Sequence, residues 1–316
     1  MSANTRVTVV GETLVDLLWP AGAREVRAVA GGSPANVAVG LHRLGRPVTL
    51  VTTWGDDAPG RFVGAHLAGI GVDVRRVPAG DPRTTVALAS LDAGGAADYD
   101  FLTHWDPQEL NVPADTAVLH TGSLAVVVEP GAARVLELCE RERAQGRSVA
   151  ADLNVRPAVQ PDPDAYRTAA GRLAAVTEVL KASDEDLAWL FPGLDPAEAA
   201  RSLLARGPRL VVVTLGAEGA LAVTAGHDVQ VRAPHIDVVD TVGAGDTFQA
   251  ALLDSLAERG GPPSSRDGLA ATLARCVTAA ALNCARTGAD PPTRAELQAA
   301  GTRPGEPGET RAPSSG

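Results

Sequence analysis

The chain reads VVDTVGAGDTF at 238–248 and continues as QAALL at 249–253, a turn of small residues that opens an apolar helix. Because residues 243–245 carry no bulky side chain, their backbone N–H groups can approach an anion, and the amino end of a helix favours negative charge. The turn therefore predicts a cradle for phosphate oxygens. Asp246 stands beside it, where a carboxylate could accept a hydroxyl proton during phosphoryl transfer. Taken alone, such a segment is more often an ordinary helix start with a first-turn aspartate.

A second glycine turn lies near the amino terminus, where residues 31–45 read GGSPANVAVGLHRLG. A glycine pair permits backbone hydrogen bonds to a hydroxylated ligand, and Asn36 in the first helical turn offers both a donor and an acceptor. These are the groups that a neutral polyol requires. The segment alone is equally consistent with close helix packing, so it gains weight only together with residues 243–246.

Short apolar runs rich in β-branched residues alternate with segments of helical periodicity along most of the chain. This alternation predicts a parallel sheet covered by helices, since crossovers between parallel strands are almost always right-handed. The economical architecture is one open α/β sheet whose ligand sites lie beyond the carboxyl ends of the strands. The predicted strands cover residues 7–10, 48–53, 117–119, 148–151 and 210–214.

Two segments interrupt this alternation, at about 12–30 and 84–105. The second reads TTVALASLD, then a Gly94-Gly95 turn, then DYDFLTHW, which is typical of a hairpin. Strand pairs outside the main sheet could form a lid over its edge, although an ordinary surface hairpin fits the pattern as well. Unpaired strand edges also invite a partner, so the lid strands could instead form a homodimer interface.

The composition limits the classes of function. Twenty-eight basic and 38 acidic residues give a net charge of −10, and the arginines are spread singly, which argues against nucleic acid as a partner. The three cysteines share no CxxC spacing, and no run of about 18 apolar residues could span a bilayer, so we expect a cytoplasmic protein without membrane contact. We expect one α/β domain over 1–300 and a flexible tail over 301–316, which is rich in Gly, Pro, Ser and charge.

The two glycine turns together resemble the paired signatures of the ribokinase-like, or PfkB, family of carbohydrate kinases. The likeness runs from about Val7 to about Pro292. Three further segments are most similar to the fructokinase and 2-keto-3-deoxygluconate kinase branch: GETLVD at 11–16, DLNVRP at 152–157 and KASDEDL at 181–187. The resemblance implies a ribokinase-like, open and mostly parallel α/β sheet, flanked by helices on both faces, with a small β-strand lid.

The resemblance also implies a reaction, the transfer of the ATP γ-phosphoryl group to a sugar hydroxyl. Asp246 would act as the general base. The backbone of the turn would form the anion hole, with contributions from Gly243, Ala244 and Gly245. The positions that match sugar-binding residues of the family are Asp16, Gly31, Gly32, Asn36 and Phe101. Asp16 is expected at the end of a strand-like segment, where its carboxylate would hold two neighbouring hydroxyls.

Nucleotide contacts are implied by the same resemblance for Asn154, Arg156, Lys181, Ser183, Thr214, Gly216, Gly219 and Asn283. Residues 213–219 could equally be a plain hairpin connection, and the two interpretations do not exclude each other. Lys181, the only lysine of the chain, could contact phosphate or merely end a strand. Arg156 is expected near the phosphates of the nucleotide or of a phosphorylated substrate.

Metal binding is where the sequence departs from the family pattern. The frequent Asn-x-x-Glu appears here as Ser183 to Asp186, so contact between Asp186 and Mg²⁺ would run through water. The ion itself is required for ATP chemistry. Asp240, the Val242 carbonyl and Gly288 resemble a monovalent-cation loop that orders the anion hole in some members, which implies a K⁺ site.

The expected substrate depends on the second lid strand, at 99–104. A keto acid would need a cation for its carboxylate, and only His104 or Arg83 could supply one there, neither of them in a matching position. A neutral sugar is therefore favoured, with fructose first, while ribose, a nucleoside and 2-keto-3-deoxygluconate stay open. The altered Ser183 and Asp186 also leave open a sugar or nucleotide sensor that keeps the fold but transfers nothing.

Overall fold

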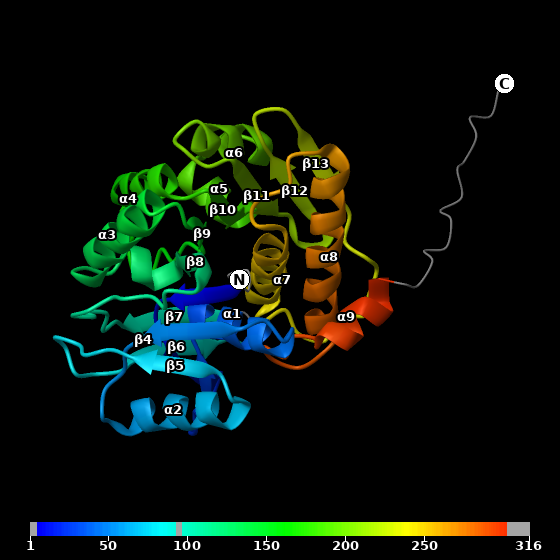
Figure 1. Cartoon of the computed structure of the whole chain (residues 1–316). Helices are drawn as coiled ribbons and strands as arrows, with labels where there is room; N and C mark the ends of the chain where they lie inside the picture. Colours follow the sequence, from blue (N-terminus) through cyan, green and yellow to red (C-terminus); the bar gives the residue numbers. More distant parts are fainter. Residues whose placement is uncertain (1–4, 93–96, 302–316) are drawn as a thin grey trace.

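A nine-stranded sheet forms the centre of the computed structural model, which describes residues 5–92 and 97–301 (Figure 1). The strand order is β13-β12-β11-β10-β9-β8-β1-β4-β5. Neighbours from β11 to β5 pair in parallel, and β12 pairs antiparallel with β11 and β13. The predicted open, mostly parallel sheet is thereby confirmed. Its strands are β1 Arg6–Val10, β4 Val48–Thr52, β5 Asp73–Arg76, β8 Thr116–Gly122, β9 Ser148–Asp152, β10 Val179–Ser183, β11 Leu210–Thr214, β12 Ala220–Val223 and β13 Asp228–Val231.

Helices cover both faces of this sheet, so its central strands are buried on both sides. Every residue of β4, which reads VTLVT, is buried, as is typical of a central parallel strand. One apolar core joins the sheet to α1, α7 and α8, and two others join it to α3 and to α4 through α6. Figure 1 shows where these helices lie around the sheet. The helices are α1 Ser33–Arg43, α2 Ala58–Ile70, α3 Gly131–Ala144, α4 Pro163–Val176, α5 Asp184–Leu190, α6 Pro196–Leu204, α7 Ala244–Arg259, α8 Arg266–Cys284 and α9 Arg294–Gly301, with short 3₁₀ turns η1 Ser123–Val126 and η2 Gly216–Glu218.

A second sheet contains the two segments that interrupt the α/β alternation. Its order is β3-β2-β6-β7, and its strands are β2 Leu14–Pro20, β3 Arg27–Gly31, β6 Thr85–Leu91 and β7 Ala97–Leu102. Strands β6 and β7 pair antiparallel, as a hairpin requires, and β2 joins β6 in parallel. The Gly94-Gly95 turn of the predicted hairpin lies outside the described residues. We call this four-stranded sheet the lid sheet.

The amino ends of α1 and α7 lie close together because the two helices pack tightly. A Cβ atom on Gly40 of α1 would lie 2.7 Å from the Ala250 Cβ in α7, so the glycine permits the close approach. Each helix also begins after a glycine with left-handed backbone, Gly32 with φ of 104° and Gly243 with φ of 75°. Both turns thus reach the carboxyl edge of the sheet, where the ligand site was expected.

The end of the chain differs from the expectation at one residue. Gly301, expected in the tail, is the last residue of α9, and the rest of the expected tail lies outside the described residues. No helix within 5–92 and 97–301 is long and apolar enough to cross a membrane. The three cysteines, Cys139, Cys276 and Cys284, form no disulfide.

Candidate active site

The two glycine turns meet at one carboxylate. Asp246, in the first turn of α7, accepts a hydrogen bond from Asn36 Nδ2 at 2.8 Å on Oδ2 and one from Ser33 Oγ at 2.6 Å on Oδ1. The side chain is half-buried, so α1 fixes its orientation while solvent still reaches it. Ser33 is an addition that the motif alone does not indicate. Only its position beside Gly32 could have suggested it.

A second carboxylate, Asp16 in β2, lies within electrostatic reach of the first. Burial raises the pKa of Asp16 to about 6, while the charge of Arg156 lowers it and that of Asp246 raises it. Gly31 leaves the space for this carboxylate, because a Cβ atom there would lie 2.1 Å from Asp16 Oδ2. Asp16 is the third residue of β2 and not the end of a strand, since β2 continues to Pro20 in the lid sheet.

Aromatic rings from β7 lie beside Asp16 on the same face of the lid sheet. Ala87 is paired in register with both Asp16 and Phe101, so the three side chains point to one side. Phe101 stacks on Tyr99, with ring centroids 5.8 Å apart. Burial raises the pKa of Tyr99, and the charge of Asp16 raises it further. Tyr99 is therefore a second aromatic group at this position.

Arg156 lies within electrostatic reach of these lid residues. Its Nη1 donates to the Val155 carbonyl at 3.0 Å, and its charge lowers the pKa of Asp16 and of Glu12. Glu12 is buried just after β1, where burial raises its pKa to about 7, and its Oε2 accepts from Ala125 N at 3.2 Å. A cavity opens beside the start of α7, and the described residues that line it do not include Arg156. Its expected position near the phosphates of the nucleotide or of a phosphorylated substrate stays a prediction.

That cavity, of about 570 Å³, opens at the carboxyl ends of β10 and β11 beside the start of α7. Its volume is in the range of small-molecule sites. Ala244 and Gly245 form part of its wall, so it adjoins the glycine turn. Asn154 has a φ of 40°, a backbone conformation that residues other than glycine seldom adopt and that is enriched at functional sites. Six residues with an expected nucleotide contact line it: Asn154, Lys181, Ser183, Thr214, Gly216 and Gly219.

One wall of the cavity is apolar, and no motif indicates it. Ile236 and Val238 contribute from the loop before α7, and Val277, Ala280 and Ala281 contribute from α8. In the sequence, α8 is apolar around most of its circumference, so residues that face a cavity look like core residues. Only the packing of α8 against α7 shows which apolar residues of α8 face the cavity and which belong to the core.

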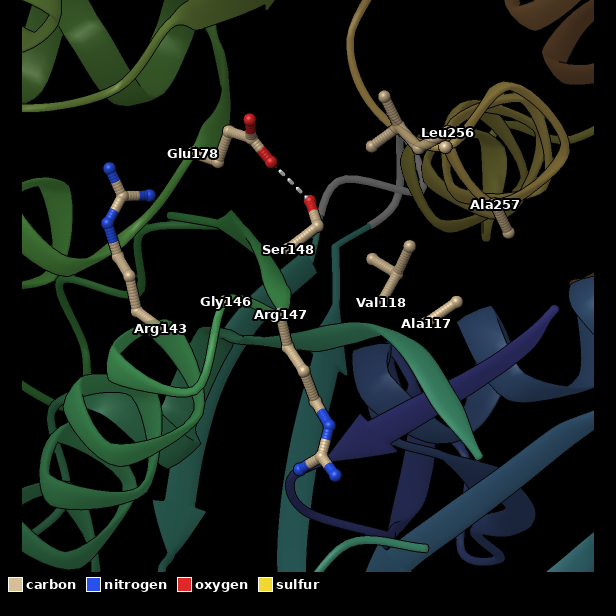
Figure 2. A pocket seen from close by; sticks show the side chains of 10 residues that line it. Ala117, Val118, Arg143, Gly146, Arg147, Ser148, Glu178, Leu256 and Ala257 are labelled. Atoms are coloured by element: carbon tan, nitrogen blue, oxygen red, sulfur yellow. Dashed lines mark hydrogen bonds between the residues drawn. The ribbon is translucent and has the colours of Figure 1, made fainter. Parts of the chain in front are cut away.

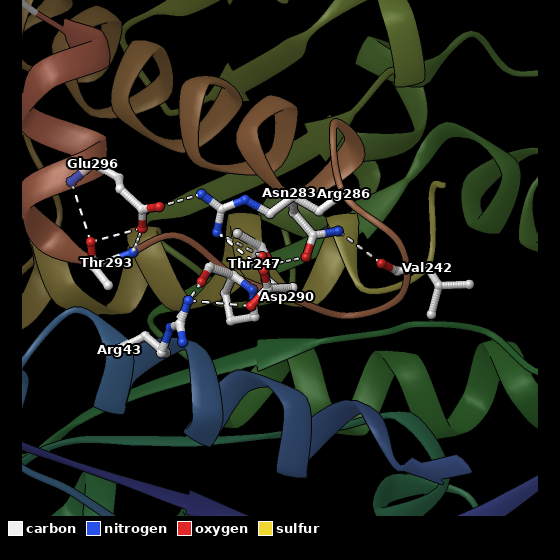
Figure 3. A network of polar contacts seen from close by, with 9 residues as sticks. Arg43, Val242, Thr247, Asn283, Arg286, Asp290, Thr293 and Glu296 are labelled. Carbon is white, nitrogen blue, oxygen red and sulfur yellow. Dashed lines mark hydrogen bonds and ion pairs between the residues drawn. The ribbon is translucent and has the colours of Figure 1, made fainter. Parts of the chain in front are cut away.

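Asn283 holds the loop before α7 instead of lining the cavity (Figure 3). Its Nδ2 donates to the Val242 carbonyl at 2.8 Å, and its Oδ1 accepts from Thr247 Oγ1 at 3.2 Å. The side chain is fully buried, and both of its polar atoms are used within the protein. The following loop is fixed by an ion pair between Arg286 and Glu296 of α9. Asn283 therefore stabilises the glycine turn at the start of α7 from behind.

The acidic group expected near Mg²⁺ is already hydrogen-bonded. Asp186 accepts from Val155 N and Ser183 N, each at 2.8 Å, and forms the capping box of α5. Asp184 and Glu185 line the cavity beside it, and Glu185 is exposed. Because Mg²⁺ keeps several waters and binds mainly through substrate phosphates, these carboxylates fit water-mediated contact. Among the described residues, no three His, Cys, Asp or Glu side chains cluster as a direct metal site.

The expected K⁺ residues lie together, and backbone N–H groups donate to the oxygens of the carboxylate. Asp240 accepts from Val242 N at 3.0 Å and from Gly288 N at 2.8 Å. The Val242 carbonyl accepts from Asn283, as described above. Each of these oxygens accepts one hydrogen bond and keeps a further lone pair, so the arrangement fits the oxygen ligands of a monovalent cation.

Another cavity, of about 430 Å³, lies at the opposite end of the sheet (Figure 2). It is lined by the beginnings of β8 and β9 and by the last turns of α7. Glu178 on its wall accepts from Ser148 Oγ at 2.6 Å, and Arg143 stands across from it. None of the expected site residues lines this cavity. It lies at the amino ends of the strands, whereas open α/β sheets bind ligands at the carboxyl ends.

The site combines a carboxylate, a glycine-rich helix start and a cavity of nucleotide size. This combination is typical of an enzyme that phosphorylates a hydroxyl group. Comparison with known proteins gives the family. The chain belongs to the pfkB family of carbohydrate kinases, whose sequence profile matches residues 4–296. It is therefore a sugar kinase, and the predicted family and fold are confirmed.

Individual relatives are mostly fructokinases. The chain is 35% identical to a fructokinase of Klebsiella pneumoniae over 295 residues, which cover 90% of this chain and 95% of the relative. It is 32% identical to an aminoimidazole riboside kinase of Salmonella typhimurium over 264 residues, 81% and 82% of the two chains.

Solved structures agree with this assignment. The fold matches a fructokinase from Xylella fastidiosa with bound ATP, with a TM-score of 0.82 and 26% identity over 94% of this chain and 98% of that one. It also matches a Vibrio cholerae fructokinase double mutant in a form with bound fructose, ADP and potassium ion. That match has a TM-score of 0.79 and 26% identity over 95% and 99% of the two chains.

Proposed function

We propose that the protein transfers the γ-phosphoryl group of ATP to a hydroxyl of a neutral sugar, with fructose as the first candidate. The observation that carries this proposal is the pair of hydrogen bonds that Ser33 and Asn36 of α1 donate to Asp246. These bonds hold the carboxylate directly beside the glycine turn of α7. A general base needs such a fixed position, within reach of the proton it removes. The 35% identity to a fructokinase supports the choice of sugar.

In this mechanism Asp246 accepts the proton of the attacking sugar hydroxyl. The sugar oxygen forms a bond to the γ-phosphorus while the bond from that phosphorus to the bridging oxygen breaks, and ADP leaves. The N–H groups of Gly243, Ala244 and Gly245 donate to the oxygens of the phosphoryl group during the transfer. ATP would occupy the 570 Å³ cavity, with its base against the apolar wall of α8 and its phosphates toward Gly245.

The sugar would bind between α1 and the lid sheet. Asp16 would accept hydrogen bonds from two neighbouring hydroxyls, Asn36 and the Gly31-Gly32 backbone would complete the contacts, and Phe101 would cover an apolar face of the sugar. Arg156 offers the cation that a keto acid would need, which keeps 2-keto-3-deoxygluconate as an alternative. Its charge already acts on Asp16 and on Glu12, however, and this balance favours a neutral ligand.

The proposal includes two cations, Mg²⁺ at the phosphates of ATP and K⁺ at the loop before α7. Mg²⁺, held through water by Asp184 and Glu185 and with an indirect contribution from Asp186, would neutralise charge on the β- and γ-phosphates. A K⁺ ion would bind at the loop of Asp240, whose two oxygens each accept one N–H, from Val242 or from Gly288, and keep a lone pair for the ion. We therefore propose that K⁺ activates the enzyme by ordering this loop. The use of ATP fits the expected cytoplasmic location.

A homodimer through the lid sheet completes the proposal. Trp19 and Leu102 lie on the face of the lid sheet opposite Asp16. Side chains alternate along a strand: Trp19 is three residues after Asp16, and Leu102 follows Phe101, which shares the face of Asp16. They are 44% and 68% exposed, so a partner that covers this face would remove their apolar surface from water. Ribose, a nucleoside and a non-catalytic sensor remain the alternatives.

The decisive experiment is a coupled ADP-release assay over fructose, ribose, 2-keto-3-deoxygluconate and a nucleoside, with Mg²⁺ and K⁺ present. We expect fructose to have the highest kcat/KM. Asp246→Asn should lower kcat by about 10²–10⁴-fold while ATP still binds. Asp164→Asn, at an exposed site on α4, is the matched control. Near-normal turnover of Asp246→Asn would overturn the assigned base, and binding without turnover of any sugar would favour the sensor.

A further inference from the structure

An ion pair is buried beneath the glycine turn. Lys181 Nζ donates to Asp152 Oδ2 at 2.8 Å, and the two side chains are only 5% and 2% exposed. The residues are paired in register on the neighbouring strands β10 and β9, so their side chains leave the same face of the sheet. They stand near the carboxyl ends of these strands, below the start of α7.

Lys181 points at the anion hole. A Cβ atom on Gly245 would have Lys181 Nζ as its nearest neighbour, at 3.7 Å, and both residues line the 570 Å³ cavity. Lys181 is thus the middle residue of a strand and not its end, contrary to one of the two sequence interpretations. Its ammonium group lies where the phosphoryl group would meet the backbone N–H donors.

Such a pair is costly for the fold, because both charges lose their hydration. Well-packed apolar residues are often as stabilising as a buried ion pair, so its presence calls for another reason. The second carboxylate oxygen, Asp152 Oδ1, is buried and has no hydrogen-bond partner within 5–92 and 97–301. Burial also raises the pKa of Asp152 to about 6, against the opposing charge of Lys181. Asp152 therefore gives up hydration to hold Lys181 in one place.

We propose that Asp152 is a positioning residue that fixes the Lys181 ammonium beneath the anion hole, where it provides the counter-charge for the phosphoryl group in transfer. This inference rests on the proposed kinase function. The lysine approaches Gly245 from the side of the 570 Å³ cavity, whereas the sugar is proposed to bind between α1 and the lid sheet. Its positive charge therefore acts on the phosphoryl group together with the N–H donors of the turn and leaves the sugar site open. A charge in a fixed position needs no reorganisation during the reaction and so acts mainly on kcat.

The test compares kcat, the KM for sugar and thermal stability in Lys181→Met and Asp152→Asn. We expect Lys181→Met to lower kcat about 100-fold and Asp152→Asn about tenfold, with the KM for sugar within threefold in both. Asp152→Glu, which keeps the charge, should recover part of the loss. Affinity for ATP should fall in Lys181→Met, whereas affinity for AMP, which lacks the transferred group, should stay unchanged.

The matched control is Glu142→Gln, which breaks an ion pair between the buried Glu142 and the half-buried Arg147, neither of which lines the 570 Å³ cavity. It should lose stability but keep kcat. If Asp152→Asn or Lys181→Met loses stability with kcat within threefold of wild type, the pair is purely structural and the inference is wrong. If Lys181→Met does not fold, kcat of Asp152→Asn decides. A wild-type protein that phosphorylates no sugar would instead contradict the proposed function, while the ATP and AMP affinities still test the lysine.

Discussion

Asn36 Nδ2 lies 2.8 Å from Asp246 Oδ2, a hydrogen bond between residues 210 positions apart in the chain. It turns two glycine motifs, each ambiguous alone, into one site. The contact depends on the tight packing of α1 on α7, where Gly40 lies against Ala250. The same bond determines the direction of the carboxylate that we propose as the base.

Removing that bond should weaken catalysis without unfolding the protein. Asn36→Ala leaves Asp246 with one donor, Ser33, so its carboxylate can rotate away from the attacking hydroxyl. We expect kcat/KM for the sugar to fall about 10- to 100-fold, because misplaced catalytic groups cost roughly this much. Steady-state kinetics measure it. Asn111→Ala, at an exposed position, is the control and should match wild type.

The pH dependence should report Asp16. Its pKa of about 6 means that the carboxylate is charged above pH 6 and takes up a proton below it. Because the charged form is the better acceptor for sugar hydroxyls, kcat/KM for the sugar should be level above pH 6. It should fall about tenfold per pH unit below that value. In Asp16→Asn the KM for the sugar should be high and flat from pH 5 to 7, while kcat still falls at acid pH because burial raises the pKa of Asp152 to about 6 as well. A KM that keeps its rise below pH 6 in this variant would contradict the assignment.

A methyl group at position 31 should close the space for the same carboxylate. In Gly31→Ala the new Cβ atom would lie 2.1 Å from Asp16 Oδ2, so the acid must move. We expect the KM for the sugar to rise at least tenfold while the affinity for ATP stays within twofold. Gly69→Ala is the matched control, because nothing lies within 4 Å of a Cβ atom there, and it should behave like wild type.

Stability should depend on a buried carboxylate far from the site. Asp254, fully buried in α7, accepts from Arg46 at 2.6 Å and from Arg294 at 3.0 Å, and pairs with Arg275 as well. Asp254→Asn leaves three guanidinium groups without their counter-charge, so we expect a loss of about 3–5 kcal/mol in the free energy of unfolding. Denaturant unfolding measures this value. Asp228→Asn breaks a more exposed pair with Arg201 and should cost no more than about 1 kcal/mol.

The oligomeric state should depend on the outer face of the lid sheet. Leu102→Glu puts a charge on this face, so we expect the proposed dimer to dissociate, with sedimentation showing a monomer at concentrations where wild type is a dimer. Leu194→Glu, at a 45% exposed apolar residue between α5 and α6, should leave the state unchanged. A wild-type monomer at all concentrations would show that no such dimer exists.

The hydrophobic pattern alone predicts the main architecture, because each strand carries its own signature. Runs such as 48–53 and 210–214 consist of Val, Leu and Thr without the charged residues of a half-exposed strand, which is typical of strands between two layers of helices. The lid strands are recognisable for the opposite reason, as they break the helical periodicity between β1 and β8. Both signals are local, and the structure agrees with them.

The sequence by itself determined the sheet, the lid strands and the two glycine turns, since periodicity and backbone freedom are properties of neighbouring residues. Only the tertiary structure decided what depends on packing between distant segments. It brought Ser33 to Asp246, placed the charge of Arg156 within electrostatic reach of Asp16, turned Asn283 away from the cavity and paired Lys181 with Asp152. Hydrogen bonds and charges act over a few ångströms, and those distances exist only after the chain has folded.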